Sequence, residues 1–388
     1  MRTYIFILLS FFIKFSFAQS DEKIKFAGVP AISFDPDSGM GYGLIGSMFV
    51  EKPGFSPYKN SLDAQILLST KNAHSHYLKF DQQKPFLLPL RLISKVGFFS
   101  TDSNNYCGKA SDADCSPKNQ VQHFYHNRFM SINGLLFAQW LLYESDFKLS
   151  LATNYLGNYY FNKNNEESLY TKDFPDTKKN QGYLSTFELG LILDKRDFEP
   201  SATSGYLVET SVRGGHKIIL SNWNYLGVNL SGRYFLAFDE QKRVVLAAQS
   251  IADSIFGELP FDALSKVGGM HSLNNYSAIG GKYLGRGISD QKFVGRLKLM
   301  EQLELRYRFV SFNLLKQDFD LSTVAFGDVG MTAWDYHRLK KDMQRVYTGF
   351  GSGLRIHWNK SFIIRADLGF SPQEHYSPKF YLAVGQVF

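Results

Sequence analysis

Long hydrophobic runs are almost absent from this sequence. After residue 17, no segment approaches the roughly 18 uninterrupted apolar residues that a membrane-spanning helix requires. The sequence therefore excludes a bundle of transmembrane helices. If the protein lies in a membrane, it must cross the membrane with β-strands.

Clustered basic residues and catalytic constellations are also missing. The 43 Lys and Arg against 36 Asp and Glu give a formal charge of +7, but they are spread along the chain, so no nucleic-acid patch is indicated. No Ser-His-acid arrangement can be assembled, and no helix is expected after the glycines of 280–287, which argues against a phosphate loop. The pairs His74–His76 and His123–His126 lack partner ligands. We expect no enzyme, metal or cofactor, and outer-membrane lipid as a partner.

The N-terminal residues predict export. Arg2 supplies a positive charge, residues 4–17 are mostly apolar, and residues 16–18 read Ser-Phe-Ala, a small-x-small cleavage site. We expect residues 1–18 to be a secretory signal peptide and residues 19–388 to form the mature protein.

Two cysteines lie close together in a polar stretch. In an exported protein, Cys107 and Cys115 favour a disulfide that closes a small loop. The alternative is a cation site formed by Asp102, Asp112 and Asp114. The disulfide is the better prediction, because aspartates are common in exposed loops.

Most of the chain alternates between apolar and polar residues. Successive strand residues point to opposite faces, so each alternating segment has one apolar and one polar face. Sixteen segments show the pattern, near 28–36, 40–51, 60–71, 73–83, 90–100, 123–139, 145–158, 183–194, 204–216, 222–238, 243–255, 297–312, 319–332, 347–358, 361–370 and 379–388. An aromatic content of 16% with a mean hydropathy of −0.21 suits a barrel with a lipid-facing exterior and a wet interior, although a secreted β-sandwich would share it.

The lengths of the connections distinguish these two folds. The long connections all follow odd-numbered segments, whereas those after even-numbered segments are mostly short. The long ones are 101–122, 159–182, 256–296 and 333–346. In an antiparallel barrel they emerge at one end, as in outer-membrane barrels. We predict an all-β transmembrane antiparallel barrel of about sixteen strands, in the outer membrane of a Gram-negative bacterium.

The last segment ends in an aromatic residue. We expect Phe380, Leu382, Val384 and Phe388 to share one face. Such a strand resembles the sorting signal by which the outer-membrane barrel assembly machinery recognises the barrels that it assembles.

The second half of the chain carries a series of short motifs. They are Asp194-Lys195-Arg196-Asp197 with Thr203-Ser204-Gly205-Tyr206, Gly285-Arg286-Gly287-Ile288, Leu303-Glu304-Leu305-Arg306, Phe326-Gly327-Asp328-Val329-Gly330, Gly351-Ser352-Gly353-Leu354-Arg355 and Gly385-Gln386-Val387-Phe388. Together, and in this order, they resemble the barrel of the Omp85 (BamA-like) family over residues 190–388. The flanks Gly285 and Ile288 depart from the family pattern. Residues 19–27 leave no room for the family's periplasmic POTRA domains, since a domain needs about 50 residues.

The resemblance implies an internal site. In the family, the sixth extracellular loop folds into the lumen, and its arginine pairs with acids on the barrel wall. A buried arginine needs carboxylate partners because an unpaired buried charge is costly. We therefore expect a lock made of Arg286, Gly287, Glu304, Phe326, Asp328 and Gly330. The alternative is that Arg286 is an ordinary exposed loop residue.

The seam between the first and last segments is a second candidate. Pro30 removes a backbone donor from the first segment, and Gly28 and Gly385 weaken strand pairing. Such a seam could open laterally toward lipid. Equally, these residues could simply end their strands.

These features predict a non-enzymatic barrel that assists the translocation or insertion of a polypeptide substrate at the outer membrane. Without POTRA domains, delivery of the substrate would need a separate periplasmic or lipoprotein partner, or contact with the barrel itself. The alternatives are a porin-like channel for small solutes and a structural subunit of an outer-membrane complex.

Overall fold

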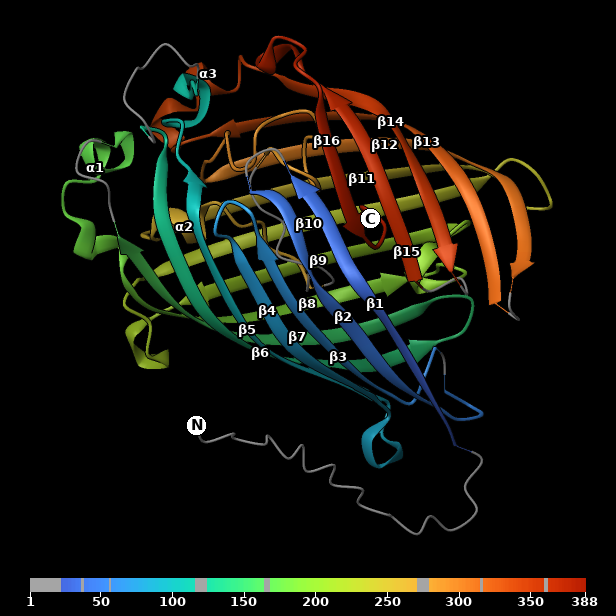
Figure 1. The fold of residues 1–388 in the computed structure, drawn as a ribbon. Coiled ribbons are helices and arrows are strands. Elements are labelled where there is room, and N and C mark those ends of the chain that lie inside the picture. The colour runs from blue at the N-terminus through green and yellow to red at the C-terminus, as the bar shows by residue number, and fades with distance from the viewer. Residues whose placement is uncertain are drawn as a thin grey trace, which may run out of the picture.

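The alternating segments form one closed antiparallel sheet (Figure 1). The computed structural model describes residues 22–35, 38–55, 57–115, 124–163, 168–270, 279–314, 317–358 and 362–388. Within them, the sixteen strands are β1 (Lys23–Asp35), β2 (Gly39–Glu51), β3 (Asn60–Ser69), β4 (His74–Gln83), β5 (Leu90–Asn105), β6 (His126–Glu144), β7 (Lys148–Lys163), β8 (Gly182–Asp194), β9 (Gly205–Gly215), β10 (Tyr225–Ala237), β11 (Val244–Gly257), β12 (Leu297–Leu314), β13 (Gln317–Ala333), β14 (Tyr347–Trp358), β15 (Phe362–Phe370) and β16 (Lys379–Val384). Each strand pairs with its sequence neighbours, and β1 pairs with β16. The predicted sixteen-stranded barrel is confirmed.

Side chains alternate between the two faces of the barrel wall. On β12, Leu303 and Leu305 are 50% and 46% exposed on the outside, whereas Gln302, Glu304 and Arg306 are buried on the inside. A water-soluble fold would bury the leucines and expose the charges. The observed arrangement is that of a barrel whose outer face meets lipid.

Several strand ends differ from the predicted ranges. β1 begins at Lys23 rather than near residue 28, and β5 continues to Asn105, because the ladder between strands extends past the apolar alternation. At the other end of the chain, β16 stops at Val384 and not at residue 388. The predicted signal peptide, residues 1–18, lies outside the described residues and stays a prediction.

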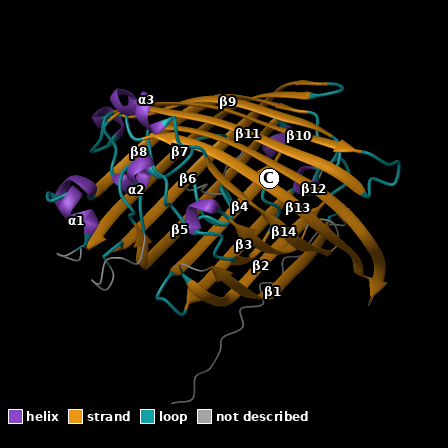
Figure 2. Cartoon of the chain, turned by 90° about the horizontal axis from the view of Figure 1, so that it is seen from above, coloured by secondary structure: helices purple, strands orange, loops and turns teal. Residues whose placement is uncertain are grey.

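The short helices lie in connections that follow odd-numbered strands. They are α1 (Leu169–Asp173), α2 (Phe261–Leu264) and α3 (Leu339–Asp342), and they gather at one end of the barrel, which we call the outer end (Figure 2). Single 3-10 turns occur at Pro85–Leu87, Ala110–Asp112, Thr177–Asn180, Glu199–Ser201, Lys217–Ile219, Tyr336–Arg338 and Pro372–Glu374. In the described part of the chain, no helix has the length and apolar character to span a membrane.

Candidate functional site inside the barrel

We call the connection between β11 and β12, residues 258–296, loop 6. Its described residues, 258–270 and 279–296, fold into the barrel. The backbone of its tip closes on itself: the Gly280 amide donates to the Leu284 carbonyl (2.6 Å), and the Gly281 amide donates to the Ile288 carbonyl (2.9 Å). The side chains of Leu284 and Ile288 are buried in one cluster with Met300, which faces inward from β12. Apolar packing against the wall thus positions the tip.

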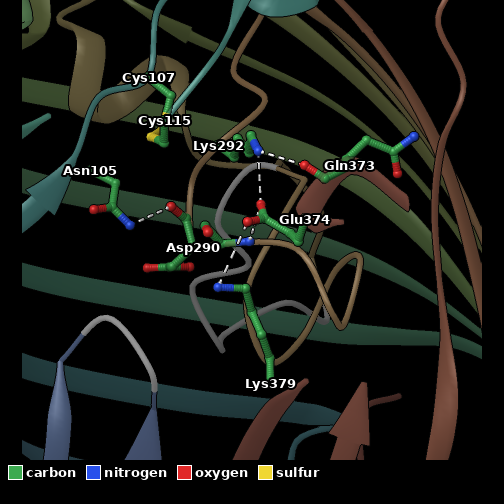
Figure 3. The surroundings of a disulfide bond; sticks show 9 residues. Asn105, Cys107, Cys115, Asp290, Lys292, Gln373, Glu374 and Lys379 are labelled. Carbon is green, nitrogen blue, oxygen red and sulfur yellow. Dashed lines mark hydrogen bonds and ion pairs between the residues drawn. A yellow bond between two sulfur atoms is a disulfide. The ribbon is translucent and has the colours of Figure 1, made fainter. Parts of the chain in front are cut away.

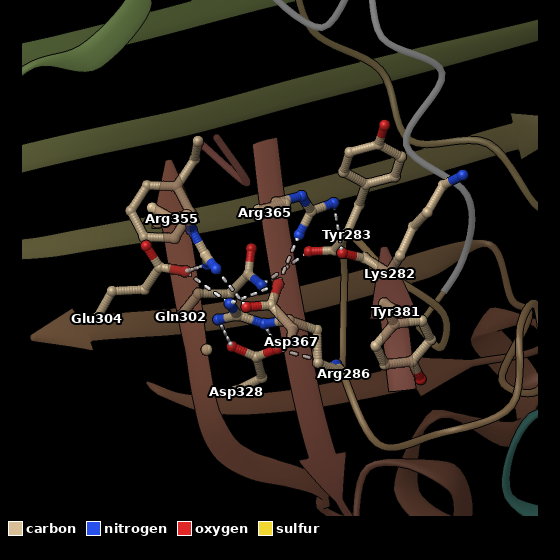
Figure 4. Close-up of polar contacts among 12 residues, drawn as sticks. Lys282, Tyr283, Arg286, Gln302, Glu304, Asp328, Arg355, Arg365, Asp367 and Tyr381 are labelled. Carbon is tan, nitrogen blue, oxygen red and sulfur yellow. Dashed lines mark hydrogen bonds and ion pairs between the residues drawn. The ribbon is translucent and has the colours of Figure 1, made fainter. Parts of the chain in front are cut away.

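Arg286, at the tip of loop 6, lies between two inward-facing acids (Figure 4). Its guanidinium group donates to both carboxylate oxygens of Asp328 on β13, Nε to Oδ2 at 3.0 Å and Nη2 to Oδ1 at 2.8 Å. Nη1 donates to Oε1 of Glu304 on β12 at 2.6 Å. The ring of Phe326 lies beneath, with its centroid 3.6 Å from the guanidinium carbon. The structure thus brings together the four side chains that the sequence singled out.

The charge of Arg286 is held by these neighbours. All three charged side chains are fully buried, so each needs its partners to offset the loss of hydration. Although burial alone would lower it, the carboxylates of Asp328 and Glu304 raise the pKa of Arg286 above its usual value. The guanidinium group therefore stays protonated.

At two glycines, loop 6 and the barrel wall approach each other closely. Gly287 has a positive φ of 94°, and a Cβ atom there would lie 2.5 Å from the backbone oxygen of Phe370 on β15. At Gly330 a Cβ atom would lie 2.8 Å from Ile279 of the tip and from Met300. Backbone and side chains approach too closely at both positions for any other residue to fit without a shift.

The ionic cluster extends beyond the residues that the sequence singled out. Asp367 on β15 accepts from Arg355 of β14 (Nη1 to Oδ1, 2.5 Å) and from Arg365 (Nη1 to Oδ2, 2.9 Å). On β12, Arg306 Nε donates to Oε2 of Glu304 at 2.8 Å. Strand alternation in the sequence places these arginines and Asp367 inside the barrel. It does not say which of the inward side chains contact each other.

Other wall side chains hold the backbone of the tip. Arg365 Nη2 donates to the Lys282 carbonyl (2.9 Å), and Gln302 Nε2 donates to the Tyr283 carbonyl (2.8 Å). On β16, the hydroxyl of Tyr381 contacts the Gly287 amide at 3.2 Å. The tip is therefore tied to strands on both sides of Arg286.

A second stretch of loop 6 docks elsewhere on the wall. The Gly268 amide donates to Oδ1 of Asp253 (3.2 Å), and the Gly269 amide donates to Oε1 of Glu188 (3.3 Å). Asp253 is itself held by two hydrogen bonds from Arg213, at 2.8 and 3.0 Å. No sequence pattern predicted this contact, because the glycines match no motif.

The last part of loop 6 contacts two segments at the outer end of the barrel, the β15–β16 connection and the end of β5 (Figure 3). Lys292 Nζ donates to Oε1 of Glu374, in the β15–β16 connection, at 2.9 Å and to the Gln373 carbonyl at 3.0 Å. The Asp290 carbonyl accepts from Asn105 Nδ2, at the end of β5, at 3.0 Å. Loop 6 thus spans the lumen from one side of the barrel to the other.

The predicted disulfide between Cys107 and Cys115 is present, and its loop packs on the connection that carries α3. Ser111 Oγ donates to Asp342 Oδ1 at 2.5 Å. Asp112 pairs with Arg338, in the 3-10 turn before α3, and with Lys341 in α3, at 2.6 and 2.8 Å.

The aspartates considered for a cation site have other contacts. Asp102 pairs with Arg128, and Asp112 lies in the ion pairs just described. In the described ranges, no three His, Cys, Asp or Glu side chains are grouped as metal ligands would be. His123 lies outside the described residues, and the rings of His74 and His76 contact each other on β4.

The seam between β1 and β16 is much shorter than the other strand junctions. Among the described residues, the two strands share one registered pair, Phe34 with Leu382. By contrast, β1 pairs with β2 along its whole length, and there Pro30 lies opposite Leu44. Gly385, with a φ of 89°, follows the end of β16 and has no partner in the β1 ladder.

The expectation that Phe388 shares a face with Phe380, Leu382 and Val384 is wrong. Phe380 and Val384 are exposed on the outside, but Phe388 is buried inside the barrel, 5.2 Å from the guanidinium carbon of Arg306. The left-handed backbone at Gly385 ends the strand, so parity no longer predicts the face of later residues.

These observations define the structural class of the protein. A closed antiparallel wall that is apolar outside and charged inside, with a loop folded into its lumen, is the architecture of an outer-membrane β-barrel. The Omp85 superfamily domain matches residues 61–388, so the chain belongs to the Omp85 superfamily and to the outer membrane of a Gram-negative bacterium. The match begins well before residue 190, where the sequence motifs start.

Several solved structures have a similar fold. BamA from Haemophilus ducreyi lacking POTRA domains 1–3 matches with a TM-score of 0.55 at 16% identity, covering 95% of this chain and 70% of that one. CdiB from Escherichia coli matches with a TM-score of 0.63 at 13% identity, covering 96% of this chain and 64% of that one. CdiB from Acinetobacter baumannii matches with a TM-score of 0.51 at 14% identity, covering 95% of this chain and 60% of that one. The chain thus spans less than two thirds of either CdiB chain. A comparison with curated proteins gives no match.

Proposed function

We propose that this barrel assists the passage or insertion of a polypeptide at the outer membrane. Membership in the Omp85 superfamily supports this role. So does the lumen, where loop 6 is tied to β12, β13, β15 and β16 by hydrogen bonds and ion pairs. A binding surface and a gated path, rather than a chemical reaction, would carry the activity.

The observation that carries the proposal is the short seam. Opening β1 from β16 disrupts a junction with a single registered pair, whereas any other opening breaks a full ladder. An opened β1 offers unpaired amides and carbonyls, to which an incoming strand can add by β-augmentation. Pro30 and Gly28 reduce the pairing of that edge further.

The test ties the seam shut. Phe34→Cys with Leu382→Cys places two thiols directly opposite each other across the seam, and a disulfide between them closes it. Ala366→Cys with Leu382→Cys is the matched control, because it bridges the permanent β15–β16 ladder with one cysteine in common.

The readout is the folding of a urea-unfolded eight-stranded outer-membrane barrel into vesicles that contain the purified protein. The seam disulfide should abolish the acceleration of folding, and reduction should restore it. The control disulfide should change nothing. Equal acceleration by both oxidised variants would contradict insertion through the seam.

A porin-like channel is the competing function, and it makes an opposite prediction for current. A lumen crossed by loop 6 should give small, flickering conductance in planar bilayers. A large, steady conductance would favour the channel instead.

A further inference from the structure

Glu301 on β12 faces away from the lumen. It lies between Leu299 and Leu303, which also face outward, and alternates with the buried residues Met300 and Gln302. Among the residues that the structure describes, it is the only charged side chain on the outward faces of β10, β11, β12 and β13 away from the strand ends. A single carboxylate therefore interrupts an apolar surface.

Aromatic residues on either side of Glu301 indicate its depth in the membrane. Glu301 lies opposite Ser250 on β11. On β11, Phe256 lies six residues beyond Ser250 toward the outer end. On β12, Tyr307 lies six residues beyond Glu301 toward the other end. Both rings are exposed on the outside. At about 3.3 Å per residue and a tilt of about 45°, each ring is about 14 Å away along the barrel axis. Exposed aromatic rings mark the two membrane interfaces, so Glu301 lies near the middle of the hydrocarbon layer.

Only one of the two carboxylate oxygens of Glu301 has a hydrogen-bond donor among the described residues. Ser250 Oγ donates to Glu301 Oε2 at 2.6 Å. Within the described residues, Oε1 has no hydrogen-bond partner. A carboxylate at the membrane centre is costly, and ionisable residues in such positions generally serve a function.

A groove of about 460 Å³ adjoins Glu301. It runs across β10 to β13 between two rows of outward residues. The row toward the outer end is Leu230, Ala252, Leu299 and Met331, and the other row is Gly232, Ser250, Glu301 and Val329. No atom lies within 4 Å of the position that a Cβ of Gly232 would take, so the groove is open there. We call this surface the Glu301 groove.

We propose that the Glu301 groove receives a membrane-embedded segment of a partner protein that places a lysine or arginine against Glu301. Small residues such as Gly232 and Ala252 let another segment approach closely, as small residues do where helices associate in lipid. A cation would satisfy the open oxygen of Glu301, and its charge would be offset in a medium where neither charge is stable alone.

Other occupants fit less well. Lipid headgroups lie at the interface and not at the depth of Glu301. A second copy related by a two-fold axis would present the same groove, so that Glu301 would meet Glu301 with no cation between them. Glu301 on β12 also lies four strands from β16 at the seam, which separates this contact from the path proposed for the substrate.

Site-specific photo-crosslinking in living cells tests the proposal. A photoreactive residue replaces Ala252 in the groove, and Leu136, exposed on the outward face of β6, serves as the control position. The expected result is an adduct with one other protein from position 252 and none from position 136. The adduct should fall at least tenfold in Glu301→Leu, and its peptide should map to a membrane-embedded segment that carries Lys or Arg. An adduct between two copies of this chain, adducts with lipid only, no adduct at all, or one that Glu301→Leu leaves unchanged would each overturn the proposal.

A second measurement separates partner binding from folding. In lipid vesicles without a partner, purified Glu301→Leu should keep or raise the temperature at which the barrel loses its heat-modifiable folded form, because leucine suits a lipid-facing position. If the substitution lowers that temperature, Glu301 is a structural partner of Ser250 and the proposal is wrong.

Discussion

Arg286 donates three hydrogen bonds to Asp328, two from its guanidinium group and one from its own backbone amide, which lies 2.9 Å from Oδ2. One carboxylate on β13 therefore fixes both the side chain and the main chain at the tip of loop 6. The contact determines where the tip lies along the barrel as well as which way Arg286 points.

Removing Arg286 should destabilise the barrel strongly. Arg286→Ala leaves Asp328 buried without its cation and removes one of the two arginines that donate to Glu304, a change that typically costs about 3–5 kcal/mol. Arg286→Lys is the matched control: it keeps the charge but loses the bidentate geometry, so its loss should be smaller. Urea unfolding in lipid vesicles measures both. Equal stability of wild type and Arg286→Ala would show that the cluster does not hold the fold.

Gly287 should tolerate no side chain. Gly287→Ala forces a residue with Cβ into a φ of 94° and against the Phe370 carbonyl, and the cost should be about 1–3 kcal/mol. Gly327→Ala, on the outward face of β13 with open space around it, should change little. Protease digestion of loop 6 in the two purified variants tests the difference. Comparable resistance in both variants would argue against close docking of the tip.

Asp262 in α2 should make stability depend on pH. Burial raises the pKa of this carboxyl from 3.8 to about 6, although hydrogen bonds from Asn162 and Asn104 oppose the shift. The folded protein therefore keeps a proton that the unfolded chain releases, so stability should fall as pH rises from about 4 to about 6, by up to about 3 kcal/mol. Above that range the loss is constant.

The control for this prediction is Asp262→Asn, which cannot ionise. Urea unfolding between about pH 4 and pH 7 should show that it lacks this downward trend and is more stable than wild type at neutral pH. The same pH dependence in both proteins would assign the effect to other groups.

Opening the disulfide should loosen the outer end and leave the barrel intact. Replacing Cys107 and Cys115 with serine frees a short loop, at a cost of about 2–3 kcal/mol. The loop that then moves also carries Ser111 and Asp112, the partners of Asp342 and Arg338. Proteases added outside intact cells should cleave this region faster in the variant, while heat-modifiability persists. An unchanged cleavage rate would mean that the polar contacts suffice without the disulfide.

The strands follow from the sequence because strand parity is a local property. Alternation of apolar and polar residues sets the face of Leu303, Glu304 and Leu305 whatever the rest of the chain does. The lengths of the connections then place α1, α2 and α3 at one end. Local pattern also predicted the disulfide, since its two cysteines are near in sequence and in one loop.

The meeting of residues from distant strands depended on tertiary structure. Parity places Arg355 and Asp367 inside the barrel but does not say that they pair, because strand register, barrel closure and the path of loop 6 decide which inward residues meet. Alternation mispredicted the face of Phe388 because the left-handed backbone at Gly385 ends β16 before it. Similarly, the sequence places Glu301 outside, but only the barrel shows that it borders a groove near mid-membrane. Side-chain direction is fixed by neighbouring residues, whereas contact requires the whole sheet to close.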